Sequence, residues 1–247
     1  MNYILQTNSL TKKYKNFQAL NGLTMNVPKG SIYGFVGKNG AGKTTLIRLI
    51  CGLQEPTSGS FSLYGIRNDS KDIIKSRRRM GAVVETPSIY MDMTAEENLK
   101  HQYLILGLPS FDCIQELLKL VGLDNTGEKK AKNFSLGMKQ RLGLARVLAG
   151  QAELLLMDEP FASLDFLTRA ELQSQLLAIQ EKLPRTIVLV THQLEEALLL
   201  GRRIIVMHPD STICEFDLTD LPYPRDLDDP TLRRLKEAIT DQCRYTA

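Results

Sequence analysis

Gly37-Lys38-Asn39-Gly40-Ala41-Gly42-Lys43-Thr44-Thr45 is the stretch from which the rest of the chain can be interpreted. Residues 31–36 before it predict a short strand, and residues 46–51 after it predict a helix. The glycines let successive backbone N–H groups point inward and cradle a polyphosphate, together with the positive N-terminal end of the helix. A glycine-rich surface turn is the simpler alternative, but the flanking strand and helix are the context that a phosphate-binding loop requires. The stretch therefore predicts a nucleotide-binding protein.

Side chains in and near this loop have predicted contacts with the nucleotide. Lys43 is expected to reach the β- and γ-phosphates, and the Thr44 hydroxyl to bind Mg²⁺. Tyr14, exposed among lysines, can stack on a purine ring, although a half-buried turn residue is the alternative interpretation. The predicted contacts are Tyr14, Gly37, Asn39, Gly40, Ala41, Gly42, Lys43, Thr44 and Thr45.

Polar residues follow three predicted strands of the nucleotide core. Asp158 and Glu159 come after the apolar run 154–157, which is typical of a strand buried on both faces. We expect Asp158 to complete the magnesium site through water, and Glu159 to orient and deprotonate the attacking water. His192 follows strand 186–190, where it could donate to a γ-phosphate oxygen or be purely structural. Glu85 ends strand 80–85, and we predict it as a third residue of the magnesium site, the alternative being a strand end that meets solvent.

A helical period replaces the strand pattern after residue 94. Thr94 and Glu97 form a capping-box pattern, and Leu99, Tyr103 and Leu106 should share one apolar face. The domain division that follows is a helical subdomain at residues 87–144 within a nucleotide-binding core at residues 1–86 and 145–247. The tail after Pro209 is rich in proline and aspartate and predicts loops, with a short helix from about residue 230 to 239.

A second anion site is predicted at the start of the last helix in this subdomain. Ser135 is placed to cap a helix that runs to about Leu148. Its hydroxyl and the Gly137 N–H would then be offered at a helix N-terminus, where anions bind favourably. A helix that is merely capped is the alternative interpretation.

Composition narrows the function classes. A formal net charge of +3 gives no basis for a nucleic-acid or membrane-surface partner. The four cysteines are widely separated, so we expect free thiols in a reducing compartment. The sequence has no apolar run near the roughly 18 residues of a membrane span and no signal peptide, so we expect a cytoplasmic protein.

Taken together, these motifs resemble the nucleotide-binding subunits of ABC transporters over almost the whole chain. Tyr14 matches the family's adenine-stacking residue, residues 37–44 its phosphate loop, and residues 135–141 its signature. Asp158 and Glu159 match its magnesium aspartate and catalytic glutamate, and His192 its switch histidine. Residues 162–165, which end at Asp165, match the D-loop at the family's dimer interface.

The departures from the family pattern resemble one subgroup, the exporters of bacitracin-type and lantibiotic peptides. Leu136 and Met138 replace a glycine and a glutamine of the signature, and Glu85 stands where the family has glutamine. Through about residue 144 the chain resembles exporters of bacitracin-type and lantibiotic peptides. From about residue 153 it is similar to the ATPases of nitrate, sulfonate and taurine importers. A recombined or engineered chain and ordinary divergence would each explain this mosaic.

The resemblance implies an α/β fold, a phosphate-loop NTPase (RecA-like) core with an antiparallel β subdomain and a helical insertion. It implies Mg²⁺-dependent ATP hydrolysis in a head-to-tail dimer, with Lys43, Thr44 and Asp158 of one copy facing Ser135 and Gly137 of the other. It also implies a homodimer, or a heterodimer with a related ATPase, held at the inner face of the cell membrane by transmembrane permease subunits.

Export of antibiotic peptides is the leading hypothesis and import the second. A soluble ABC ATPase acting on DNA or ribosomes, and a phosphate-loop kinase or GTPase, are the alternatives outside transport.

Overall fold

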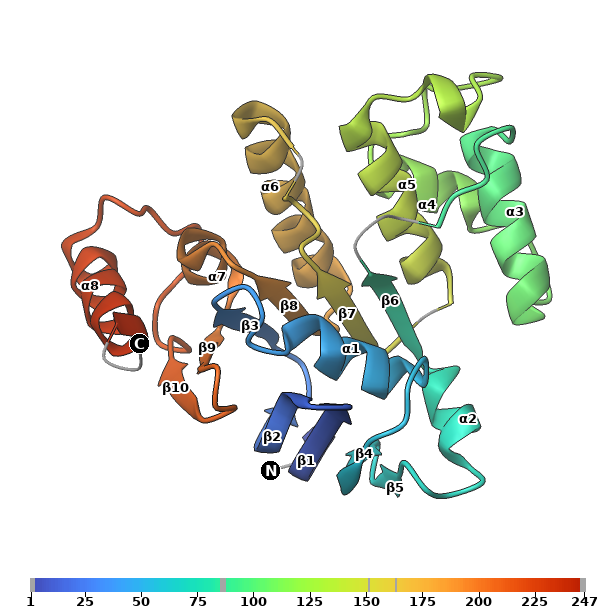
Figure 1. Cartoon of the computed structure of the whole chain (residues 1–247). Coiled ribbons are helices and arrows are strands. Elements are labelled where there is room, and N and C mark those ends of the chain that lie inside the picture. Colours follow the sequence, from blue (N-terminus) through green and yellow to red (C-terminus); the bar gives the residue numbers. More distant parts are fainter. Residues whose placement is uncertain (1–2, 85–87, 151, 163, 245–247) are drawn as a thin grey trace.

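A six-stranded sheet forms the centre of the molecule (Figure 1), as the computed structural model of residues 3–84, 88–150, 152–162 and 164–244 shows. Its spatial order is β10-β9-β3-β8-β7-β6. The strands are β3 (Ile32–Gly37), β6 (Met80–Val84), β7 (Leu154–Asp158), β8 (Thr186–Thr191), β9 (Arg203–Met207) and β10 (Ile213–Asp217). All run parallel except β10, which pairs antiparallel with β9. The C-terminal ends of β3, β8, β7 and β6 therefore meet along one edge.

A second, antiparallel sheet has the order β2-β1-β4-β5. Its strands are β1 (Tyr3–Tyr14), β2 (Phe17–Pro28), β4 (Ser58–Leu63) and β5 (Ile66–Arg67). The sequence predicts small strands here, whereas β1 and β2 have 12 residues each. Shifts of register next to Ser9 and Gly22, which both have positive φ, interrupt the apolar alternation and make each long strand resemble short pieces.

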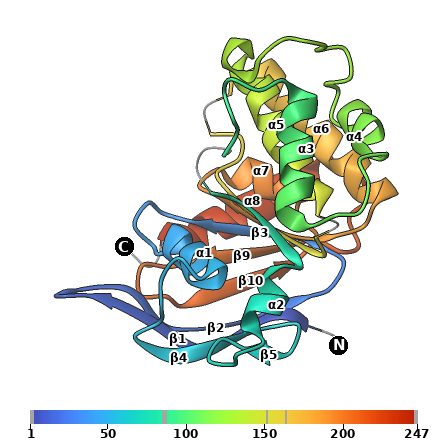
Figure 2. The same cartoon turned by 90° about the vertical axis from the view of Figure 1, so that its right-hand side faces the viewer.

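Strand β7 shows why its sequence is apolar throughout. Leu155 and Met157 pack into the cluster that includes the helical layer, while Leu154 and Leu156 pack into the cluster with α1 (Lys43–Cys51) and the antiparallel sheet. Successive side chains of a strand point to opposite faces, so a strand covered on both sides needs apolar residues at every position. Figure 2 shows this layering, with helices above the sheet and the antiparallel strands below.

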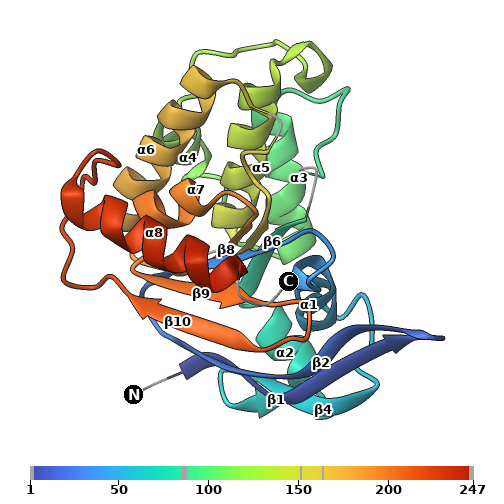
Figure 3. The same cartoon turned by 60° about the vertical axis from the view of Figure 1, so that its left-hand side comes forward.

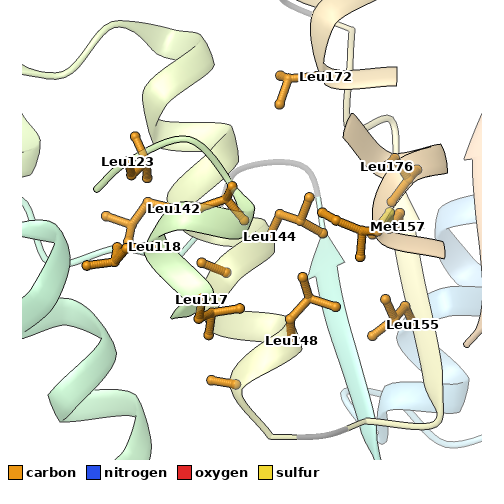
Figure 4. Close-up of a cluster of buried hydrophobic side chains, with 14 of the residues drawn as sticks. Leu117, Leu118, Leu123, Leu142, Leu144, Leu148, Leu155, Met157, Leu172 and Leu176 are labelled. Atoms are coloured by element: carbon orange, nitrogen blue, oxygen red, sulfur yellow. The ribbon is translucent and has the colours of Figure 1, made fainter. Parts of the chain in front are cut away.

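The helical layer packs through one continuous apolar cluster. Its helices are α3 (Ala95–Leu106), α4 (Ile114–Leu120), α5 (Leu136–Ala149) and α6 (Phe166–Lys182). Figure 4 shows how Leu144 and Leu148 of α5 lie between α4 on one side and β7 and α6 on the other. Both predicted caps are confirmed, because the Thr94–Glu97 capping box and the Ser135 cap are present. Leu106, expected on the apolar face, is 37% exposed, since α3 ends there beyond the cluster.

Among the described residues, three further α-helices are α2 (Ile73–Arg77), α7 (Leu194–Leu200) and α8 (Pro230–Arg244). In Figure 3, α8 lies beside α7 and above β9, and Leu232 and Ile239 of α8 pack with Leu198 of α7. The prediction of a loop-rich tail is wrong in part, because β10 forms there and α8 continues to Arg244. An edge strand such as β10, which alternates Cys214 and Phe216 with acidic residues, has no distinct signal in sequence.

The α/β class predicted from the sequence is confirmed. Cys51, Cys113 and Cys214, the described cysteines, are free thiols. None of the helices in the described ranges is both long and apolar enough to cross a bilayer.

Gly34 in β3 is predicted to be essential for the packing of α7 on the sheet. A Cβ at this position would lie 2.7 Å from the Cβ of Ala197 and 3.2 Å from its Cα, so α7 would have to move. We expect Gly34→Ala to lower the free energy of unfolding by about 1–3 kcal/mol, as overpacking does, in a urea titration.

Gly150→Ala is the matched control. Its Cβ would meet only the end of the Leu106 side chain, so we expect a change within about 0.5 kcal/mol. Equal effects of the two substitutions would contradict this account of α7 packing.

Candidate nucleotide-binding site

The loop between β3 and α1 takes its shape from glycine. Gly40 and Gly42 have φ values of +86° and +98°, in the region where a side chain is strained. A Cβ on Gly37 would come within 2.6 Å of the Met207 carbonyl oxygen, and one on Gly42 would collide with the Ala19 carbonyl. Glycine at these positions lets the loop pack directly on β2 and β9, and that packing sets the path of its backbone.

Lys43, the first residue of α1, is only 6% exposed. Its ammonium group donates to the carbonyl oxygens of Gly37 at 2.7 Å and Lys38 at 3.1 Å. Burial lowers the pKa of Lys43, while the negative charges of Glu159 and Asp158 act in the opposite direction. The loop thus holds a cation in its interior, with the carboxylates of Asp158, the last residue of β7, and of Glu159, the next residue, nearby. A cation placed in this way can neutralise the oxygens of a phosphate.

Glu159 and His192 meet at the C-terminal edge of the sheet. The Oε2 atom of Glu159 lies 2.7 Å from Nδ1 of His192, and the Glu159 N–H donates to the Val190 carbonyl at 2.9 Å. Glu159 has a φ of +50°, a strained backbone conformation for a residue other than glycine. Such strain often accompanies functional sites, where the surrounding structure maintains it. The Glu159 carboxylate is therefore held at a defined place, where it can accept a proton from a water molecule.

The nearby oxygen atoms suit a small divalent cation. Thr44 is half-buried beside Lys43, and the Asp158 side chain is 1% exposed at the end of β7. A hydroxyl and a carboxylate are ligands that Mg²⁺ accepts, with phosphate and water oxygens completing its octahedron. The described residues contain no group of three or more His, Cys, Asp or Glu side chains that could hold a metal by themselves. The donor set therefore fits Mg²⁺ bound together with a phosphate.

Ser135 and Gly137 lie elsewhere in the same chain. Ser135 is exposed at the start of α5, where its Oγ accepts from the Met138 N–H at 3.2 Å. A Cβ on Gly137 would collide with the Thr168 methyl group, so α5 begins close against the first turn of α6. In Figures 1 and 2 this end of α5 is at the far end of the helical layer, apart from the loop before α1. A single chain does not bring the two predicted anion sites together.

Tyr14 is the last residue of β1 rather than a turn residue. Its hydroxyl donates to the Gln54 side chain, and the Lys12 ammonium lies 5.3 Å from the centre of its ring. Its partner in β2 is Phe17. This end of the hairpin is near the phosphate loop, because Gly42 packs on Ala19 of β2. Stacking of Tyr14 on adenine stays a prediction.

The other predicted site residues have simple placements. Asn39 and Gly40 are exposed, Ala41 is buried, and Thr45 is half-buried. Asp165 caps α6, where its carboxylate accepts from the Thr168 N–H at 3.1 Å and this bonding lowers its pKa. Glu85 lies outside the described residues.

Two charged side chains next to this site were not predicted from the sequence. Arg169 of α6 and Glu196 of α7 form an ion pair, and the Glu196 carboxylate is close enough to Glu159 and His192 to interact with them electrostatically. Each is four residues beyond a predicted site residue, Asp165 and His192 respectively. That spacing is the only signal in the sequence, and it does not show that the two helices meet.

Comparisons with known proteins agree with the geometry. The family profile described as "ABC transporter" matches residues 20–162. The bacitracin transport ATP-binding protein BcrA of Bacillus licheniformis is 39% identical over 221 residues, which are 90% of this chain and 72% of that protein. The taurine import ATP-binding protein TauB of Roseobacter denitrificans is 37% identical over 213 residues, 83% of this chain and 78% of that protein. Since alignments of this length cannot fit in one half, both resemblances extend over most of the chain.

Solved structures resemble the chain at the level of the whole fold. The ATP-binding cassette MJ0796, in a dimeric post-hydrolysis state with ADP and phosphate, matches with a TM-score of 0.76 and 28% identity. That match covers 87% of this chain and 98% of the cassette. CbiO1 of Clostridium perfringens, part of the transporter complex CbiONQ, matches with a TM-score of 0.80 and 25% identity, over 99% of both chains. The predicted phosphate-loop NTPase fold is therefore confirmed. The chain belongs to the ABC transporter family, in which it is an ATP-binding, ATP-hydrolysing subunit.

Proposed function

We propose that two copies of this chain, or one copy and a related ATPase, close head to tail over ATP and drive the export of bacitracin-type peptides through a membrane permease. The observation that carries this proposal is the separation of Ser135 and Gly137 from Lys43 within one chain. A nucleotide on the loop of one copy is open to solvent until the signature of another copy covers it. Closure that depends on ATP and reverses after hydrolysis can move a permease.

Within the site, each polar side chain has a proposed part. Lys43 and Thr44 bind the phosphate end of ATP, and Asp158 with Thr44 holds Mg²⁺, which neutralises phosphate charge when bound. Glu159 orients the attacking water and accepts its proton. His192 holds the Glu159 carboxylate and offers its other ring nitrogen to a γ-phosphate oxygen. The short Glu159–His192 distance supports this division of roles.

Exposed apolar side chains at the starts of α5 and α6 support the proposed dimer. Phe166 and Leu167 at the start of α6 are 81% and 71% exposed, and Leu136 at the start of α5 is 39% exposed. The two helix ends are in contact through Gly137 and Thr168. Apolar side chains gathered on one surface favour a surface that another protein covers. The dimeric state of the MJ0796 cassette supports a second ATPase as that partner.

A groove between β6, α3 and α5 is the proposed docking place for the permease. It has a volume of about 430 Å³, and its lining includes Gln102, Leu106 and Arg146. Leu104 and Ile105 beside it on α3 are 67% and 61% exposed. An apolar rim around a groove with an arginine and a glutamine suits a short segment of another protein that is partly apolar and partly polar.

Export is preferred over import on the pattern of relatives. The BcrA proteins of two bacteria align over 90% of the chain, and both are named for bacitracin transport. TauB aligns over 83% and supports uptake of a sulfonate as the second candidate. The unusual signature residues Leu136 and Met138 add to the resemblance to exporters.

Lys43→Ala is predicted to weaken ATP binding at least about tenfold, because one charged hydrogen-bond partner of the phosphates is lost. Titration with a fluorescent ATP analogue measures the dissociation constant. The exposed Lys38 of the same loop is the control, and Lys38→Ala should change the constant less than about twofold. If both variants lost the same ATP affinity, nonspecific attraction between opposite charges would explain binding, and a specific contact of Lys43 with the phosphates would be excluded.

Glu159→Gln is predicted to lower kcat by about 10²–10⁴-fold while ATP still binds, since the amide cannot accept the proton from water. Size-exclusion chromatography with Mg²⁺ and ATP should then show a stable dimer. Glu181→Gln, an exposed carboxylate near the other end of α6, should keep the parent kcat and show no such dimer. A Glu159→Gln variant that stays monomeric at saturating ATP would rule out head-to-tail closure.

Deletion of this chain in its host is predicted to lower the bacitracin concentration that stops growth, because the exporter loses its energy source. Expression of the parent chain should restore resistance, and Glu159→Gln should not. Growth on taurine as the only sulfur source should be unchanged. Unchanged resistance together with loss of growth on taurine would favour the import function instead.

A further inference from the structure

Arg169 and Glu196 form an ion pair, buried on the Glu196 side, close to the candidate catalytic residues Glu159 and His192. Glu196, on α7, is 3% exposed, and the Arg169 side chain, on α6, is 24% exposed. The Arg169 Nε atom and the Glu196 Oε1 atom are 3.8 Å apart, an ion pair longer than a hydrogen bond. Buried charges are costly unless they are paired and hydrogen-bonded, so the remaining contacts of both side chains are informative.

The Arg169 guanidinium contacts two different loops. Its Nη1 donates to the Gln193 side-chain oxygen at 2.6 Å, and its Nη2 donates to the Leu164 carbonyl oxygen at 3.1 Å. Leu164 lies in the D-loop, residues 162–165, which lead into α6, and Gln193 directly follows His192. Because the guanidinium is planar and rigid, it fixes the two loops relative to each other.

Glu196 fixes the other side of His192. The Thr191 hydroxyl donates to Oε2 of Glu196 at 2.7 Å, and the Gln193 N–H donates to the Thr191 hydroxyl at 3.0 Å. The residues before and after His192 are therefore both held, Thr191 by Glu196 and Gln193 by Arg169. His192 itself is bonded only at its ring, to Glu159, among the hydrogen bonds of the described residues.

Of the two adjacent glutamates on α7, only Glu196 is buried and in contact with the residues around His192. Burial raises the pKa of the Glu196 carboxyl, while the Thr191 hydrogen bond and the Arg169 charge lower it. The carboxylate of Glu195, its neighbour on α7, instead points toward α8 and forms an ion pair with Lys236 at 2.7 Å. The two adjacent glutamates thus face different parts of the molecule, and only Glu196 belongs to the network around His192.

We propose that Arg169 and Glu196 are positioning residues, which tie the D-loop to the loop of His192 and so hold His192 against Glu159. This inference rests on the role given to His192 in the proposed function. A change in the D-loop, where a second copy would make contact, is then transmitted through the Arg169 guanidinium to Gln193 and His192. The pair would make the position of the histidine depend on dimer closure.

A double-mutant cycle on kcat tests this inference with the full chain. Arg169→Lys keeps the charge and loses the forked geometry, and we expect it to lower kcat about fivefold to tenfold with the KM for ATP changed less than about twofold. In a His192→Ala background the same substitution should change kcat less than about twofold, because the residue that it positions is gone. Glu196→Gln, which keeps the side-chain volume, should repeat this pattern. Glu195→Gln, the matched control on the same helix, should leave kcat unchanged in both backgrounds.

The outcomes separate the inference from the proposed function. If Arg169→Lys and Glu196→Gln lower kcat by the same factor with and without His192, the pair only joins α6 to α7 and the positioning role is wrong. If His192→Ala alone retains the parent kcat, the role of His192 in the proposed function fails, and the positioning role fails with it. Thermal unfolding of each variant identifies loss of folded protein, which would lower kcat equally in both backgrounds.

Discussion

The buried charge of Lys43 is the constraint on which the site depends. An ammonium group taken out of water destabilises the fold unless other groups compensate it. Here the carbonyl oxygens of Gly37 and Lys38 accept hydrogen bonds from the ammonium group, and the carboxylates of Asp158 and Glu159 supply opposite charge. The loop can hold this charge only because glycine lets its backbone pack on β2 and β9. The same loop that stabilises the buried Lys43 ammonium group therefore forms the candidate phosphate-binding site.

The same edge of the sheet positions Glu159 and His192, the candidate hydrolytic residues. Strand β8 lies between β3 and β7, so His192 at its end is next to both the phosphate loop and Glu159. Glu159 is held by the His192 ring and by its own N–H on Val190 despite a strained backbone. In this arrangement two short loops carry the candidate catalytic residues, and the parallel sheet beneath them supplies rigidity.

The separation of the two predicted anion sites within one chain has a consequence for the proposed dimer. The start of α5 lies apart from the phosphate loop of its own chain (Figure 1), and Leu136, Phe166 and Leu167 at the starts of α5 and α6 are exposed. A protein in which all contacts to a nucleotide came from one chain could hydrolyse ATP without moving a partner. In the dimer that we propose, division of the contacts between two copies would link nucleotide binding to association, and hydrolysis to separation. The Arg169–Glu196 pair extends this link inward, from the D-loop to His192.

Sequence patterns alone determined the elements whose causes are local. The phosphate loop and α1, the caps at Thr94 and Ser135, and the buried strand before Asp158 depend on residues within a few positions of one another, so spacing was enough to predict them. The tertiary structure alone decided the order of the strands, the place of β10 and the contact of Arg169 with Glu196. These features depend on segments far apart in sequence, whose meeting is governed by the burial of surfaces over the whole molecule, and no short pattern records that. For this reason the candidate catalytic residues could be proposed from the sequence, whereas the residues that contact them from other segments could not.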